Sequence, residues 1–405
     1  MNLFHDNPEK GFDDSVFDIR AENMLLYLVL SSFLIGSVFF STTIGYIIVV
    51  GVFSIIFLCL ILLGETRLVL SKKVFWLYSG VLLLFVTGTI WNPSIRGIAR
   101  LMTFIIVTSA ILFLFIYTVD FEKFWRNYGK ASGMIVLIGF PTMFVDQVSL
   151  GPILISAYDS TPTAPFDIGI NTVSSIFINP NKLALVCGFA VVGLITTQKL
   201  TKFTLFLIAL NVFGVFVSDG QAAQLAVVAG VGIYAVGRIK QSLVPVITTA
   251  AVGAITVGLL MLFQLLPSPE MLSSVSLSGR RHLWRASVQA LEARLWVGYG
   301  TTNMATALEP YITDPRRLGV GPHNSYIRVA LSGGILAFLS YLILHLYVLV
   351  RSAHSPGRIS SASHAVLWAA IIFQLFNGAT IFGISSSSIL FAIALGWSLR
   401  DLHNR

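Results

Sequence analysis

Residues 324–350 decide the class of fold, because they form one apolar run that is long enough to cross a lipid bilayer. The run reads NSYIRVALSGGILAFLSYLILHLYVLV and contains one permanent charge, Arg328. A membrane-spanning helix needs about 20 mostly apolar residues. We therefore expect a transmembrane helix here, with its first turn near Asn324 or Ser325.

The rest of the chain has the same character. Of its 405 residues, 56% are hydrophobic and only 11% are charged, whereas soluble domains carry roughly 25% charged residues. The sequence therefore predicts an all-α polytopic membrane protein with about twelve transmembrane helices. The candidate spans are residues 24–41, 43–63, 74–91, 97–118, 130–148, 181–197, 202–218, 221–237, 243–265, 324–350, 363–380 and 384–399.

The positions of lysine and arginine predict the orientation. If the N-terminus is cytoplasmic, sixteen of the 26 Lys and Arg residues fall on inner segments, as the positive-inside rule requires. We expect a cytoplasmic tail at 1–23, one membrane domain at 24–399 and a cytoplasmic tail at 400–405. A long outer loop, residues 266–323, lies between the ninth and tenth spans.

Several functional classes are disfavoured. Cys59 and Cys187 lie in apolar runs, which is typical of packed core thiols and not of disulfides or metal ligands. The net charge of +8 indicates an anionic ligand and not nucleic acid, because the chain has no basic soluble domain with interleaved aromatic residues. The outer acidic residues are scattered, so we expect neither a metal nor another cofactor.

The outer loop concentrates arginine on the side of the membrane where basic residues are normally depleted. Ser278 is a plausible N-cap, and the residues after it predict an amphipathic helix at the membrane surface. Trp284, Val288, Leu291 and Leu295 would form its apolar face, with Arg281 and Arg285 on the opposite face. The loop arginines are Arg280, Arg281, Arg285, Arg294, Arg316 and Arg317.

Arg280 falls in the first turn of that helix, where free backbone N–H groups and the helix dipole favour an anion. A guanidinium binds phosphate oxygens in a bidentate manner, which suits a diphosphate. Lipid headgroups or the acidic residues of the loop are the competing partners. Arg294, Arg316 and Arg317 have no feature that distinguishes them from headgroup-binding residues.

His323 ends the loop, directly before the tenth span. A helix N-terminus disfavours imidazolium, so the ring is expected to be neutral and able to accept a proton. A neutral imidazole at the edge of an outer cavity can act as a general base toward a hydroxyl. The competing interpretation is a histidine that only caps the helix.

These residues form a pattern: Ser278-Gly279-Arg280 with Leu283-Trp284, then Gly298-Tyr299-Gly300, then His323-Asn324 with Gly333-Gly334. The pattern resembles that of the O-antigen ligase and polymerase superfamily, which includes exopolysaccharide polymerases, and the resemblance covers essentially the whole chain. Asn179-Pro180-Asn181 resembles a further element of the family. One departure is Ser218-Asp219-Gly220-Gln221, where related ligases often carry an arginine.

The resemblance implies a metal-independent inverting glycosyltransferase of glycosyltransferase-C-like architecture in the bacterial inner membrane, with its site facing the periplasm. The donor would be a glycan on undecaprenyl diphosphate, and the acceptor a glycan or the lipid A core. Membrane lipids and a chain-length regulator are the other implied partners. Arg280 would hold the diphosphate and His323 would activate the acceptor. The expected substrate-binding residues are Arg281, Arg285, Trp284, Asn324, Asn181 and Gln221.

Polymerase and ligase differ in their acceptor, and the missing arginine slightly favours the polymerase. A transporter or flippase is the competing class. Such carriers keep ionisable groups near mid-membrane and have related halves, and the sequence has neither feature. An arginine-rich scaffold for anionic lipids would explain the loop but not His323-Asn324 at its end.

Overall fold

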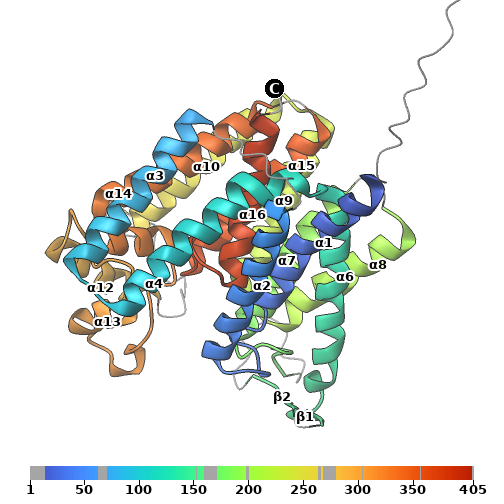
Figure 1. Ribbon diagram of the computed structural model, residues 1–405, viewed down its shortest axis with the longest axis horizontal. Coiled ribbons are helices and arrows are strands. Elements are labelled where there is room, and N and C mark those ends of the chain that lie inside the picture. The colour runs from blue at the N-terminus through green and yellow to red at the C-terminus, as the bar shows by residue number, and fades with distance from the viewer. Residues whose placement is uncertain are drawn as a thin grey trace, which may run out of the picture.

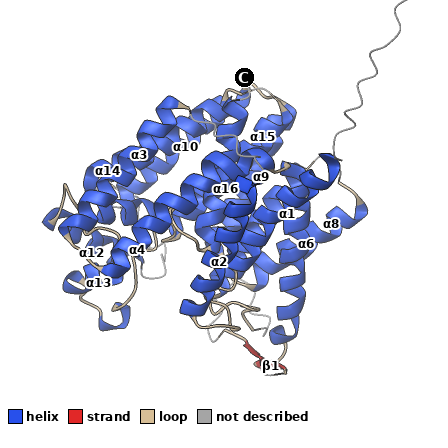
Figure 2. Cartoon of the chain, viewed as in Figure 1, coloured by secondary structure: helices blue, strands red, loops and turns tan. Residues whose placement is uncertain are grey.

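The computed structural model describes residues 14–62, 71–151, 153–158, 171–197, 200–262, 266–267, 280–302, 304–355 and 357–403. The described chain is mostly helical, with one short hairpin formed by β1 (Gln147–Leu150) and β2 (Ile153–Ser156) (Figure 2). Within these described ranges, seven helices are long and apolar enough to cross a membrane. The expected class, an all-α polytopic membrane protein, is therefore confirmed.

The seven helices differ in how far they are covered by the rest of the protein. Nearly all of α15 is buried, whereas most of α10 faces outward. They are α2 (Thr42–Leu62), α3 (Lys72–Trp91), the continuous helical segment Ile95–Thr118, α9 (Gln221–Ile239), α10 (Leu243–Leu262), α14 (Ser325–Ala353) and α15 (Arg358–Phe376).

The remaining helices complete the bundle. The segment Ile95–Thr118 begins with α4 (Ile95–Thr103), passes through two π-helical turns and ends with α5 (Ile116–Thr118). The others are α1 (Asp14–Ser32), α6 (Phe121–Gly139), α7 (Pro180–Thr196), α8 (Lys202–Val217), α12 (Arg280–Ala293), α13 (Met304–Leu308) and α16 (Ser386–His403).

Each expected span overlaps a helix, and most boundaries agree within a few residues. That twelve of them cross the membrane stays a prediction. Helix α1 begins at Asp14 and α16 continues to His403, so helical structure extends into both expected tails. The tails themselves stay a prediction.

The first expected span, 24–41, is wrong at its C-terminal end. Helix α1 ends at Ser32, residues 33–36 form turns, and Ser37 then pairs with Phe177 in an isolated β-bridge. Val38 donates its N–H to the Ile176 carbonyl at 2.9 Å, and Ile178 donates to the Gly36 carbonyl at 3.2 Å. Gly36 has a φ of +71°, which ends helical geometry at this point.

The fifth expected span, 130–148, is also misplaced. Asp120 is the N-cap of α6, and its carboxylate accepts the Lys123 N–H at 2.8 Å. The helix therefore starts among polar residues that a search for apolar runs excludes. It ends at Gly139, where a 3-10 turn containing Pro141 leads into the hairpin.

Helix α14 is broken at Gly334, which has a φ of 78° and a ψ of −175°. The break leaves backbone groups without helical partners, and the loop segment 295–300 bonds to them. Tyr299 and Gly300 donate to the carbonyls of Leu331 and Ser332 at 2.6 and 2.9 Å. Ile335 in turn donates to the Leu295 carbonyl at 2.8 Å. The segment 295–300 is thereby fixed to α14.

The same loop segment also contacts α3. An added Cβ at Gly88 would lie 2.7 Å from the Val297 and Ser332 carbonyl oxygens, so only glycine allows this approach. Thr301 then donates its hydroxyl to the Gly97 carbonyl at 2.6 Å. In Figure 1 the hairpin and helices α12 and α13 lie at the end of the bundle opposite the C-terminus.

We expect Gly334→Ala to destabilise the protein. The new methyl group would lie 2.3 Å from the Trp296 carbonyl oxygen, at a backbone conformation that alanine rarely adopts. The loss should be on the order of 2 kcal/mol or more, measured as a lower midpoint of thermal unfolding in detergent. Gly253→Ala in α10 is the control, because nothing lies within 4 Å of its added Cβ. Equal unfolding midpoints for Gly334→Ala and the wild type would contradict a stabilising role for the break in α14.

Candidate functional site

A cavity of about 760 Å³ lies where α7, α9, α12 and α14 meet the segments 317–323 and 376–379. Five of its lining residues are basic, and none of the described lining residues is acidic. The electrostatic potential inside is therefore positive, which favours an anionic ligand. The basic residues are Lys182, Arg280, Arg317, His323 and Arg328.

His323 is held in an uncommon backbone conformation, with a φ of +47°. Histidine tolerates the left-handed region better than most residues, but the conformation needs support from its neighbours. The Pro322 carbonyl accepts the indole N–H of Trp284 at 2.9 Å. On the other side, Asn324 caps α14 by accepting the Ile327 N–H at 3.0 Å. His323 thus lies between two fixed residues.

The ring of His323 reaches the open space of the cavity, although the cavity walls remove much of the surrounding water. Desolvation lowers the pKa of the ring below its usual value, and the positive charges of Arg280 and Arg328 lower it further. His323 is therefore neutral at pH 7 and able to accept a proton, as expected from the sequence.

Arg280 is half-buried at the start of the described part of α12. Its guanidinium carbon lies 5.9 Å from the centroid of the Phe376 ring, in a cation–π geometry. Burial lowers the pKa of Arg280, but an arginine remains protonated at neutral pH. The side chain brings a fixed positive charge to the same cavity as His323. The N-cap expected at Ser278 lies outside the described residues.

Three further cations of the cavity were not predicted as site residues. Arg328 donates to the Gly378 carbonyl at 2.9 Å. Lys182 donates to the Ile35 carbonyl, and its ammonium lies 5.8 Å from the centre of the Phe177 ring. In the sequence, Arg328 and Lys182 are isolated basic residues, so only the fold brings them together. Arg317, which was grouped with headgroup-binding arginines, also lines this cavity.

The residues predicted to bind substrate fall into two groups. Asn181 lines the cavity. Trp284 and Asn324 are buried instead, and Asn324 donates its amide to the Leu375 carbonyl at 3.0 Å. Their contacts position the segment that carries His323. The described residues that line the cavity do not include Arg281, Arg285 or Gln221.

The expected apolar face of the loop helix is partly wrong. Trp284 is buried, as predicted, but Val288 and Leu295 are exposed. The buried side of α12 is completed by Ala286, Ser287 and Ala290. Small residues allow α12 to pack closely against the protein, so hydrophobicity alone did not identify this face.

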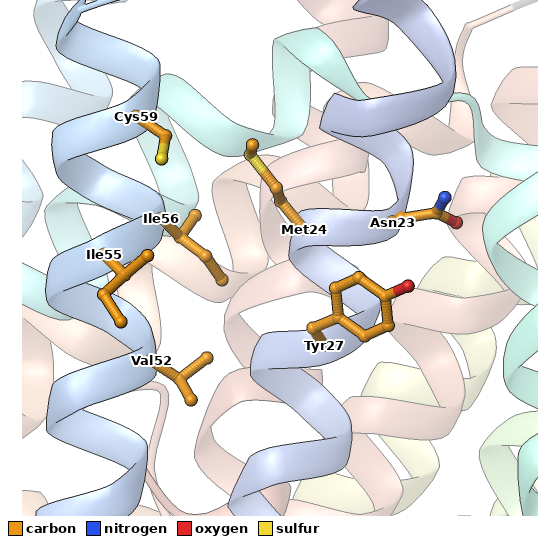
Figure 3. Close-up of a pocket in the computed structure, with 7 residues that line it drawn as sticks. All are labelled: Asn23, Met24, Tyr27, Val52, Ile55, Ile56 and Cys59. Carbon is orange, nitrogen blue, oxygen red and sulfur yellow. The ribbon is translucent and has the colours of Figure 1, made fainter.

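A second hollow, of about 450 Å³, lies between α1 and α2 (Figure 3). Met24 of α1 and Ile56 of α2 point toward each other across it, whereas the amide of Asn23 points away from α2. The lining is mainly apolar and contains no charged residue. Its described lining residues offer no cation for an anionic ligand. Among the described residues, no group of three or more His, Cys, Asp or Glu side chains could hold a metal ion.

Residues 203–342 match the family model described as O-Antigen ligase. The matched segment is about a third of the chain and runs from α8 into α14, so it includes Arg280 and His323. No curated protein matches the chain. The match confirms the resemblance to the O-antigen ligase and polymerase superfamily, and it indicates glycosyl transfer of the ligase or polymerase type.

We expect Trp284→Phe to loosen the segment that carries His323. The substitution keeps a large apolar ring but removes the hydrogen bond to the Pro322 carbonyl, which costs about 1 kcal/mol. Thermal unfolding in detergent should show a lower midpoint. Trp296→Phe is the matched control, because the Trp296 side chain is 64% exposed. A midpoint unchanged in both variants would show that the indole N–H does not stabilise this segment.

Proposed function

We propose that the protein transfers a glycan from undecaprenyl diphosphate to a sugar hydroxyl on the periplasmic face of the bacterial inner membrane. The observation that carries the proposal is the shared cavity, in which the neutral base His323 lies among cationic side chains. The family match of residues 203–342 supports the same reaction class. If the acceptor hydroxyl belongs to a growing glycan, the protein is a polymerase. We slightly prefer this acceptor to the lipid A core, which would make the protein a ligase.

In the proposed reaction, His323 takes the proton from the acceptor hydroxyl. The hydroxyl oxygen forms a bond to the anomeric carbon of the donor as the bond between that carbon and the diphosphate oxygen breaks. Attack opposite the leaving group inverts the anomeric configuration. The diphosphate leaves with the electron pair, and the proton on His323 passes to it or to water.

Arg280 is assigned to the leaving diphosphate, whose negative charge increases as the bond breaks. Fixed cations directed at developing charge stabilise the transition state without reorganising. Arg317, Arg328 and Lys182 line the same cavity. They are suited to replace the arginine that related ligases carry near residues 218–221. The cavity offers one imidazole and no carboxylate among its described lining residues, a poor donor set for a divalent cation. Arginine and lysine therefore supply the positive charge in this proposal.

A ligase that joins the finished glycan to the lipid A core is the alternative, because the same cavity chemistry serves both acceptors. A strain that lacks the gene separates them. Single-repeat glycans at the cell surface indicate a lost polymerase, whereas accumulated long lipid-linked chains indicate a lost ligase.

In that strain, complementation with His323→Ala or Arg280→Ala should fail to restore glycan transfer. The loss of one group that stabilises the transition state costs roughly 10²–10³ in rate, and both variants should still enter the membrane in normal amounts. Arg316→Ala is the control, because this loop arginine is 89% exposed and pairs with Asp314 at 3.1 Å. Wild-type product from either cavity variant would refute the assignment.

Activity of the purified protein should persist in excess EDTA, and a loss that Mg²⁺ restores would refute the metal-free mechanism.

The pH dependence of transfer should report the state of His323. Because burial and the charges of Arg280 and Arg328 lower its pKa from 6.5, the ring stays neutral until the pH falls below that value, and the rate should fall only there. Arg280→Gln removes one of the charges that lower the pKa. The residual rate should therefore decline at a higher pH in Arg280→Gln than in Arg280→Lys. Identical acid limits in these two variants would contradict this electrostatic coupling.

A further inference from the structure

A third hollow, of about 410 Å³, lies on the far side of α13 from the catalytic cavity. The first residues of α13, Met304 and Ala305, line the catalytic cavity, whereas Thr306 and Ala307 line this hollow. The end of α3 and the end of the α12 segment complete its wall. Its polar and aromatic lining residues are Asn92, Arg294, Tyr299, Thr302, Thr306 and Tyr311.

Arg294 is held in place within this hollow. Its guanidinium donates to the side-chain oxygen of Asn92, and its central carbon lies 4.8 Å from the centroid of the Tyr299 ring. Tyr299 is itself fixed, because its hydroxyl donates to the Ala290 carbonyl at 3.0 Å. Asn92 donates its own amide to the Gly88 carbonyl at 3.3 Å. The guanidinium is thus oriented before any ligand arrives.

The charge of Arg294 is not neutralised by a neighbouring acid. Within the described part of the chain, no carboxylate lies within 4.0 Å of its nitrogens. A guanidinium has five N–H donors, and only the one to Asn92 is engaged with a described residue. The remaining donors form the planar fork that binds a carboxylate or a phosphate.

A small space of about 10 Å³ lies between the hollow and the catalytic cavity, with room for about one water molecule. Arg328 lines both the cavity and this space, and Thr302 lines both the space and the hollow. Thr301 is buried beside Thr302 and fixes the wall between the two hollows. Its hydroxyl bonds to the Thr89 hydroxyl of α3 and donates to the Gly97 carbonyl of α4. No sugar fits through that space. A glycan with its reacting end at His323 would instead pass over α13, whose residues 304–307 line the cavity and then the hollow, to reach Arg294.

We propose that this hollow is a subsite for an acidic sugar of the glycan, bound through its carboxylate or phosphate substituent by Arg294. The inference rests on the proposed function. Tyrosine rings offer apolar faces to the C–H groups of a sugar, and the threonine and tyrosine hydroxyls can bond to its hydroxyl groups. A lipid headgroup would need the guanidinium but not the aromatic and hydroxyl lining.

The test uses the purified full-length protein in phosphatidylcholine nanodiscs, with the lipid-linked glycan fraction extracted from the deletion strain as substrate. Arg294→Gln should raise the half-saturating concentration about tenfold, the effect of losing one charge-assisted hydrogen bond. The maximal rate should change little, because His323 and Arg280 are intact. Arg316→Gln, which changes an arginine of the same outer loop outside all three hollows, should match the wild type.

Carboxyl reduction of the glycan, and separately removal of phosphomonoester substituents from its sugars with the diphosphate link to the lipid left intact, test the inference without altering the protein. One of the two treatments should raise the half-saturating concentration of the wild type about tenfold and abolish the difference between wild type and Arg294→Gln. Unchanged saturation after both treatments would overturn the subsite. So would an effect of Arg294→Gln that occurs only when phosphatidylglycerol is present, which would identify a lipid headgroup. Activity in His323→Ala would instead refute the proposed function itself.

Discussion

The structure depends on an exchange of backbone hydrogen bonds at the break in α14. A helix interrupted within a membrane exposes N–H and C=O groups that lipid cannot satisfy, at a cost of several kcal/mol for each group. Here the segment 295–300 supplies the missing partners, through Tyr299 and Gly300 to the carbonyls of Leu331 and Ser332. The glycines at 88 and 334 allow the chains to approach closely enough. Because α12 and α13 flank this segment, the exchange determines where Arg280 and Arg294 lie.

In the catalytic cavity one electrostatic arrangement serves two purposes. The positive charges of Arg280 and Arg328 favour an anionic leaving group, and the same charges lower the pKa of His323. A base placed among cations remains unprotonated at neutral pH, although it accepts a proton less readily. The negative charge of the proposed diphosphate would offset those cations. The imidazolium is then stabilised at the moment when the proton is transferred.

Apolar runs were sufficient to predict the class of fold and most helix boundaries, because bilayer thickness fixes the length of a span. They misplaced α1 and α6, whose limits are set by Gly36, Asp120 and Pro141 and not by hydrophobicity. Arg280 and His323 could be identified from their places beside helix starts and from the family pattern. Lys182, Arg317 and Arg328 could not, because their convergence on one cavity depends on packing between distant segments. Trp284 and Asn324 were recognised as important, but sequence could not distinguish a ligand contact from a hydrogen bond to a neighbouring backbone carbonyl.

The break at Gly334 also constrains the order in which the protein can be assembled. Residues 295–300 are synthesised before Leu331, Ser332 and Ile335, the residues that satisfy their backbone groups. Until α14 is in place, the loop can contact α3 and α4 through Arg294 and Thr301, but its backbone groups lack the partners that α14 supplies. Docking of the loop is therefore a late step of biogenesis, and the translocation machinery must release α14 before either arginine-lined hollow exists. A chain truncated within the loop would enter the membrane with its early helices in place and without a reaction chamber.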